Sequence, residues 1–171
     1  IVLIFGIKDY YEQSKIKTVL SMTVVNSMAN DTETPEQKIK ETLGYKDDPY
    51  SKVEIGVNLT TDSEMAEFDY NAQMAYVAQI QAGSIDIMVM PEKLYQTLKK
   101  NEPFADLKEL LGEEAFEKFG MQTDTTHISI TESELEQELG VIYDPVCIAV
   151  PYSAPNQENA VKWIKSLDNR K

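Results

Sequence analysis

Histidine and cysteine offer wide chemistry, and this chain of 171 residues has one of each, His127 and Cys147. A zinc site usually takes four nitrogen, sulfur or carboxylate ligands. No second His and no Cys lies near His127 in the sequence, so Asp and Glu would have to supply every other ligand. We therefore predict no metal site, and we interpret His127 as a surface or strand histidine.

Cys147 lies inside the apolar run 146–150, VCIAV. A single cysteine forms no intrachain disulfide, and a cysteine in such a run is typically a small buried hydrophobe rather than a nucleophile. The motifs HExxH, CxxC and GxSxG are absent, and the 7 glycines do not gather into a phosphate-binding loop. These observations predict a chain that is not an enzyme and that carries no cofactor.

The chain is strongly acidic, with 29 acidic and 16 basic residues and a net charge of -13. A surface of this sign repels phosphate backbones and anionic lipid headgroups, which argues against nucleic-acid binding and against direct adsorption to a membrane. We expect the charge to keep the protein soluble and monomeric. An electrostatic funnel for cations is the alternative interpretation.

Apolar runs and helical patterns alternate along the chain. Strands are predicted at 16–25, 53–59, 85–90 and 141–150, with a fifth at 125–130, and the main helices at 35–43, 70–82, 91–100 and 131–139 and after Asn156. Alternating strands and helices are typical of right-handed crossovers. The sequence therefore predicts a three-layer α/β fold with a mostly parallel sheet of four or five strands and helices on both faces.

Local signals refine four of these elements. The alternation at 53–59 favours an edge strand, and Pro145 indicates that the last strand is an edge strand or has a bulge. Thr34 with Gln37 resembles a capping box for the first of these helices, and Asp69 can cap the second.

Polar residues follow the predicted strands. In open α/β sheets, ligands bind beyond the carboxyl ends of the strands. The alternative is that these residues only cap helices and fill loops. The candidate ligand-binding residues are Asn26, Ser27, Asn30, Thr61, Asp62, Glu92, Tyr152 and Ser153.

The N-terminal segment 1–15 is apolar at first, then aromatic at Tyr10 and Tyr11, then charged. This order is typical of the end of a membrane anchor, although seven apolar residues are too few to span a bilayer. The alternative is a first strand or short helix that packs on the domain. We expect residues 16–171 to form a single α/β domain.

Three segments resemble type II periplasmic (extracellular) solute-binding proteins. Residues 81–89, QAGSIDIMV, are similar to the family's AG-x-x-D-hydrophobic turn, and residues 103–111, PFADLKELL, to its D-L-x-x-hydrophobic-hydrophobic motif, with Pro103 in place of the usual Gly. Residues 148–164, IAVPYSAPNQENAVKWI, are similar to the family's return strand and following helix.

The resemblance implies a single periplasmic-binding-protein-like lobe from a bacterial protein outside the cytoplasm, anchored to the cell membrane. Single-lobed, membrane-anchored envelope proteins of Firmicutes are similar. Solute-binding proteins have two lobes, and here only residues 112–140 precede the return strand, too few for a second lobe. The departure puts a clamped ligand site in doubt.

Two functions remain open. The first is a ligand- or partner-binding domain, non-catalytic and related to solute-binding proteins, that takes a small molecule or a peptide. The second is an envelope scaffold or protein-interaction domain that has a protein partner and no small-molecule ligand. In both, contact with the membrane would be limited to the N-terminal anchor.

Overall fold

A computed structural model of the chain describes residues 2–101, 103–120, 122–131 and 133–168. Within these residues, five strands form one sheet in the order β2-β1-β3-β5-β4. β1 pairs in parallel with β2 and β3, whereas β5 runs antiparallel to both of its neighbours. The strands are β1 (Lys17–Val24), β2 (Ser51–Gly56), β3 (Ile87–Pro91), β4 (Ile128–Ile130) and β5 (Val146–Ala149). The α/β class is confirmed, and the sheet is mixed.

Successive side chains of a strand point to opposite sides of the sheet, so an interior strand contributes to the buried core on both faces. In β3, Ile87 and Val89 join the larger apolar cluster, and Met88 and Met90 join the smaller one. A strand buried on both faces has a continuous apolar sequence, as β3 does, and all five of its residues are buried.

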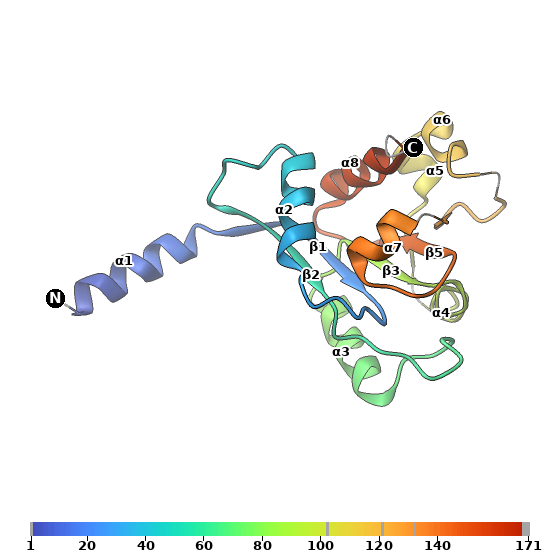
Figure 1. Ribbon diagram of the computed structural model, residues 1–171, viewed down its shortest axis with the longest axis horizontal. Helices are drawn as coiled ribbons and strands as arrows, with labels where there is room; N and C mark the ends of the chain where they lie inside the picture. Colours follow the sequence, from blue (N-terminus) through green and yellow to red (C-terminus); the bar gives the residue numbers. More distant parts are fainter. Residues whose placement is uncertain (1, 102, 121, 132, 169–171) are drawn as a thin grey trace.

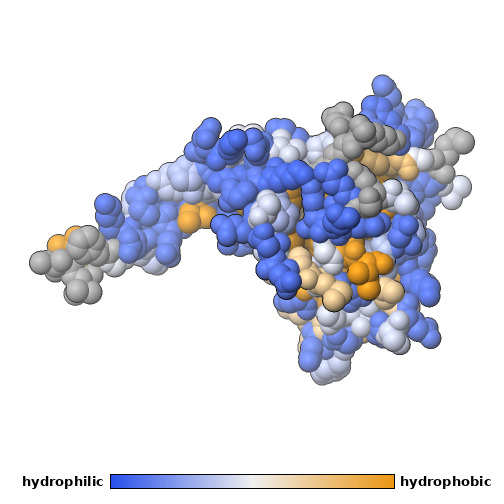
Figure 2. Space-filling view, viewed as in Figure 1, coloured by the Kyte–Doolittle hydropathy of each residue, from blue (hydrophilic) through white to orange (hydrophobic). Residues whose placement is uncertain are grey.

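Helices cover the two faces and make three layers (Figure 1). The larger cluster lies under α2 (Glu33–Thr42), α5 (Leu107–Leu111), α6 (Glu113–Glu117), α7 (Ser133–Leu139) and α8 (Gln157–Leu167). The smaller cluster lies under α3 (Tyr70–Gln81) and α4 (Glu92–Leu98). The outer surface seen in Figure 2 is mostly hydrophilic, in keeping with the net charge of -13.

Two of the local predictions are confirmed. The Asp69 side chain accepts a hydrogen bond from the N–H of Ala72 and caps α3. β2 is an edge strand, as its alternation predicted.

Two others are wrong. The start of α2 is held not by Thr34 but by Asp31, whose carboxylate accepts from the N–H groups of Glu33 and Thr34. β5 begins after Pro145 and lies between β3 and β4, so the proline precedes an interior strand and interrupts none.

The N-terminal segment forms a helix, α1 (Val2–Ser14), that projects away from the sheet (Figure 1). Only its last turn reaches the domain among the described contacts, where the Tyr50 hydroxyl donates to Glu12 at 2.8 Å. Four of its large apolar side chains are exposed: Ile4, Ile7, Tyr10 and Tyr11. The alternative that this segment packs on the domain is therefore wrong. No helix in the described part of the chain combines the length and hydropathy needed to cross a bilayer.

Candidate functional site

The carboxyl ends of β1 and β2 meet, as expected for neighbouring parallel strands. Asn26 follows β1 with a φ of 54°, a left-handed conformation that asparagine tolerates. Its side-chain amide donates to the Thr61 hydroxyl at 2.7 Å, and its amide oxygen accepts from the Thr61 N–H at 3.0 Å. The two residues satisfy each other, so their polar groups join two loops.

Ser27 and Asp62 also bond within the loops. The Ser27 hydroxyl donates to the carbonyl of Leu139 at 2.6 Å and ties the β1–α2 loop to the end of α7. The Asp62 carboxylate accepts from the N–H of Ala66 at 3.0 Å and closes a turn. For these residues, the alternative of a loop and cap role describes the geometry.

Asn30 lies in a groove of about 440 Å³ between the β1–α2 loop and α7. Gly140 sets the width of this region because it has a φ of +66°, and a Cβ there would lie 2.5 Å from the Ala29 nitrogen. The Lys38 ammonium contacts the carboxylates of Glu134 and Glu138. The groove is lined by Ala29, Asn30, Asp31, Thr34, Pro35, Lys38, Gln137 and Glu138.

Tyr152 and Ser153 lie at the opposite end of the sheet. β5 is antiparallel to β3, so its carboxyl end is next to the amino end of β3. The Ser153 carbonyl approaches Gly83, and the Tyr152 N–H donates to the carbonyl of Pro103. The prediction that these two residues join Asn26 is therefore wrong, because it assumed a parallel last strand.

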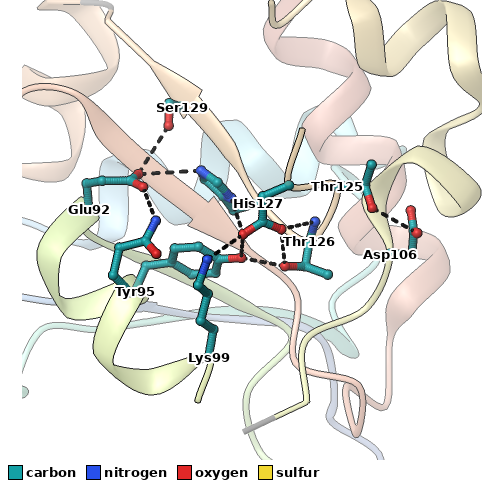
Figure 3. Close-up of polar contacts among 10 residues, drawn as sticks. Glu92, Tyr95, Lys99, Asp106, Thr125, Thr126, His127 and Ser129 are labelled. Atoms are coloured by element: carbon teal, nitrogen blue, oxygen red, sulfur yellow. Dashed lines mark hydrogen bonds and ion pairs between the residues drawn. The ribbon is translucent and has the colours of Figure 1, made fainter. Parts of the chain in front are cut away.

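Glu92 directly follows β3 and begins α4, where it meets side chains from β5 and from the segment before β4. Its carboxylate lies 3.5 Å from His127 Nε2 (Figure 3). One ligand atom from each of Glu92, His127 and Cys147 lies within 4.8 Å of the other two. Of the two interpretations of His127, the surface residue is wrong, since only 5% of it is exposed, and the strand residue is close, since His127 immediately precedes β4.

The other ring nitrogen of His127 faces a second carboxylate. His127 Nδ1 lies 3.6 Å from Asp124 Oδ2, beyond hydrogen-bond range, and it is buried without a hydrogen-bond partner. The Tyr95 ring packs on the imidazole with 4.2 Å between ring centroids. His127 is thus held between two acids and against an aromatic ring.

Asp124 is fixed by its own contacts. Its carboxylate accepts from the Tyr95 hydroxyl at 2.8 Å, from the Lys99 ammonium at 3.0 Å and from the Thr126 hydroxyl at 2.7 Å. Partial burial by itself raises the pKa of Asp124, but the hydrogen bonds from Thr126, Lys99 and Tyr95 outweigh it and hold the pKa well below its usual range. Asp124 is therefore an anion that the fold has oriented.

Cys147 is fully buried, as the sequence predicted. Burial raises the pKa of its thiol far above the usual range, and the adjacent charge of Glu92 raises it further. Because the thiolate is the nucleophile, the thiol is unreactive in this state. A thiol, an imidazole and a carboxylate in one cluster are, however, the donor set of transition-metal sites.

Sequence reasoning missed this cluster because its members are far apart in the chain. The one available signal was alternation: His127 and Ser129 alternate with Ile128 and Ile130, which predicts a polar and an apolar side for this short strand. Alternation does not say which strand lies next to it. The pairing of Ser129 with Cys147 in the sheet brings the polar side to the cysteine.

Comparison with protein-family models, with curated proteins and with solved structures finds no match for this chain.

Proposed function

We propose that this chain is a non-catalytic binding domain related to solute-binding proteins, and that it takes a small polar ligand or a peptide end in the groove beside Asn30. Support comes from the sheet: β2, β1 and β3 are parallel with their carboxyl ends at one edge, and β5 returns antiparallel through the sheet. Ligands of open α/β sheets bind at such an edge.

The observation that carries the proposal is the groove itself. It has a volume of about 440 Å³, within the range of small-molecule sites. Lys38 and Glu138, which form an ion pair with each other, supply a cation and an anion, while Asn30 and Gln137 supply amides that both donate and accept. Groups of both signs with amides match a zwitterion such as an amino acid or a short peptide.

The groove is open on one side, so affinity is expected to be weak. A site that encloses its ligand removes most of the ligand surface from water, and one lobe covers only one side. We therefore expect saturation only at high ligand concentrations.

The test is a thermal-shift screen of amino acids, short peptides and sugars on the wild-type protein, on K38M and on K46M. A bound ligand raises the melting temperature by mass action. Lys46 is a matched control, since it is an exposed lysine paired with Glu41 and outside the groove lining. We expect a shift in wild type and K46M that K38M lacks. A blank screen, or an equal shift in K38M, would contradict the groove as a ligand site.

We include in this proposal a location outside the cytoplasm and a membrane tether through the segment that contains α1. The exposed apolar side chains of α1 support it, because such a surface is unfavourable in water and favourable at a lipid interface. Protease accessibility on intact cells of the native host tests the location. Full protection of the domain until lysis would contradict it.

The same exposed surface of α1 favours a second function, a protein-interaction domain without a small-molecule ligand. Ile7 is 63% exposed and Tyr10 is 77% exposed, and neither packs on the domain. Sedimentation of the wild type and of the variant I7E/Y10E distinguishes the two functions. Self-association that this variant abolishes, together with a blank ligand screen, would favour the interaction domain.

A further inference from the structure

We propose that Glu92, His127 and Cys147 form a binding site for a divalent transition-metal ion, with zinc the best match to the donor set. In the part of the chain that the structure describes, these three residues are the group whose ligand atoms converge, all within 4.8 Å of one another. The site lies on the α4 side of the sheet, away from the groove between α2 and α7.

The separation of the donor atoms favours a metal over a direct contact. Tetrahedral zinc with nitrogen and oxygen ligands at 2.0–2.2 Å places these two atoms about 3.4 Å apart. His127 Nε2 and Glu92 Oε2 are 3.5 Å apart, which exceeds the usual hydrogen-bond distance. The Cys147 donor lies within 4.8 Å of the other two, and a tetrahedral zinc site places sulfur about 3.6 Å from each of them, so only a small shift closes the site.

The unpaired nitrogen of His127 is the second, independent observation. Histidine ligands of metals nearly always donate their other ring N–H to a carboxylate, a backbone carbonyl or a water, which fixes the tautomer and the ring orientation. His127 Nδ1 is buried, has no hydrogen-bond partner and faces Asp124 at 3.6 Å. A small rotation of the ring as Nε2 binds the metal would close this contact.

Neighbouring groups hold the ligands in place. Gln96 donates to Glu92 Oε1 at 2.7 Å, and Ser129 donates to Glu92 Oε2 at 3.3 Å. Cys147 pairs with Ser129 on one side and with Met90 on the other in an interior strand, so its backbone is fixed by the sheet. Cys147 therefore lies in a strand, Glu92 begins a helix, and His127 immediately precedes β4.

The charge of the ligands matches a divalent ion. A thiolate and a carboxylate together neutralise the two positive charges, and the thiol loses its proton as the metal binds. The Glu92 side chain is 34% exposed, which leaves an approach from solvent and a fourth position for water. Three protein ligands and one open position form a standard zinc arrangement.

The test is a titration of the metal-free protein with Co²⁺, which gives a thiolate-to-cobalt charge-transfer band only if sulfur binds the metal. We expect one Co²⁺ per chain, the charge-transfer band, and displacement of Co²⁺ by Zn²⁺. C147A should lose the band, and H127Q should lose tight binding. The control E54Q, which removes an exposed carboxylate on β2, should bind like the wild type.

Circular dichroism of each variant shows whether it is folded. X-ray absorption of the zinc-loaded wild type needs no variant, and we expect one sulfur scatterer with nitrogen and oxygen. Cobalt or zinc binding without sulfur ligation, binding that persists in C147A and H127Q, or no binding at all would overturn the proposal. The first two results would identify adventitious binding to the acidic surface.

Discussion

A carboxylate side chain flanks strand β3 at each end, and the two differ in burial: Asp86 is 0% exposed, whereas the Glu92 side chain is 34% exposed. At the amino end of β3, Asp86 accepts from the N–H of Ser21 at 2.8 Å and from the N–H and side-chain amide of Asn156 at 2.7 and 3.0 Å. At its carboxyl end, Glu92 accepts from Gln96 and Ser129, but its carboxylate lies 3.5 Å from His127 Nε2, beyond the usual hydrogen-bond distance.

The difference separates a structural group from a binding group. Buried polar groups in proteins are normally satisfied, and the Asp86 network meets this rule by joining β1, β3 and the start of α8. The cluster at Glu92 leaves one nitrogen of a buried histidine unpaired. An unsatisfied buried group has a free-energy cost, and a ligand that it binds can remove this cost.

The largest effect is expected from D86A at the amino end. The variant leaves three donors of Ser21 and Asn156 without their acceptor, each at a cost of about 1 kcal/mol or more. We expect the free energy of unfolding to fall by roughly 4 kcal/mol in denaturant titrations. The exposed control D47A should change it by less than about 0.5 kcal/mol. A loss below about 1 kcal/mol for D86A would remove the contrast between the two ends of β3.

G140A tests whether packing is also loose elsewhere at the carboxyl ends of the parallel strands, where Gly140 meets the β1–α2 loop. The new Cβ would lie 2.5 Å from the Ala29 nitrogen, and the φ of +66° is unfavourable for alanine. We expect a loss of about 3 kcal/mol, from overpacking and backbone strain together. In G83A the φ is +60° but no atom lies closer than 3.8 Å, so only the strain of about 1–2 kcal/mol should appear. Equal losses of unfolding free energy in G140A and G83A would show that the β1–α2 loop shifts easily to make room for the new Cβ.

Y95F sharpens the comparison inside the cluster. The variant removes the hydroxyl that bonds Asp124 and Thr126 but keeps the ring that packs on His127. We expect a loss of about 1–2 kcal/mol in urea unfolding, less than for D86A, because Lys99 and Thr126 still bond Asp124. The exposed control Y70F should be neutral. A loss as large as that of D86A would mean that the cluster is as structural as the Asp86 network.

D106A has the smallest expected effect, and it depends on pH. Asp106 caps α5 and accepts from the Thr125 hydroxyl beside the cluster. The hydrogen bond from the Glu109 N–H lowers the pKa of Asp106, and Thr125 lowers it further. A lowered pKa in the folded protein means stabilisation that is present above the unfolded pKa of about 4 and is lost as the pH falls through the folded value.

We therefore expect D106A to cost about 1 kcal/mol at neutral pH. The difference from wild type should shrink as the pH falls below about 4. D106N keeps a capping group that does not titrate, so it should be close to wild type at neutral pH. Unfolding measured between pH 7 and pH 3 checks this, and a D106A difference that does not change with pH would contradict it.

Much of the fold could be predicted because its signals are local. The apolar runs of β1 and β3, the alternation of β2 and the Asp69 cap each lie within a few residues of chain. Asn26 and Thr61 meet because β1 and β2 are parallel neighbours, whose carboxyl ends lie side by side. Tyr152 and Ser153 were misplaced because strand direction is not encoded in the strand itself.

The sequence alone determined the composition and the charge. It also determined the succession of helices and strands and the burial of Cys147, since hydrophobic periodicity is a property of neighbouring residues. Only the tertiary structure decided that β5 enters the sheet antiparallel between β3 and β4. That pairing brings Cys147 beside His127 and Glu92. The physical reason is that sheet register joins residues through hydrogen bonds between distant segments, and no local pattern specifies the partner.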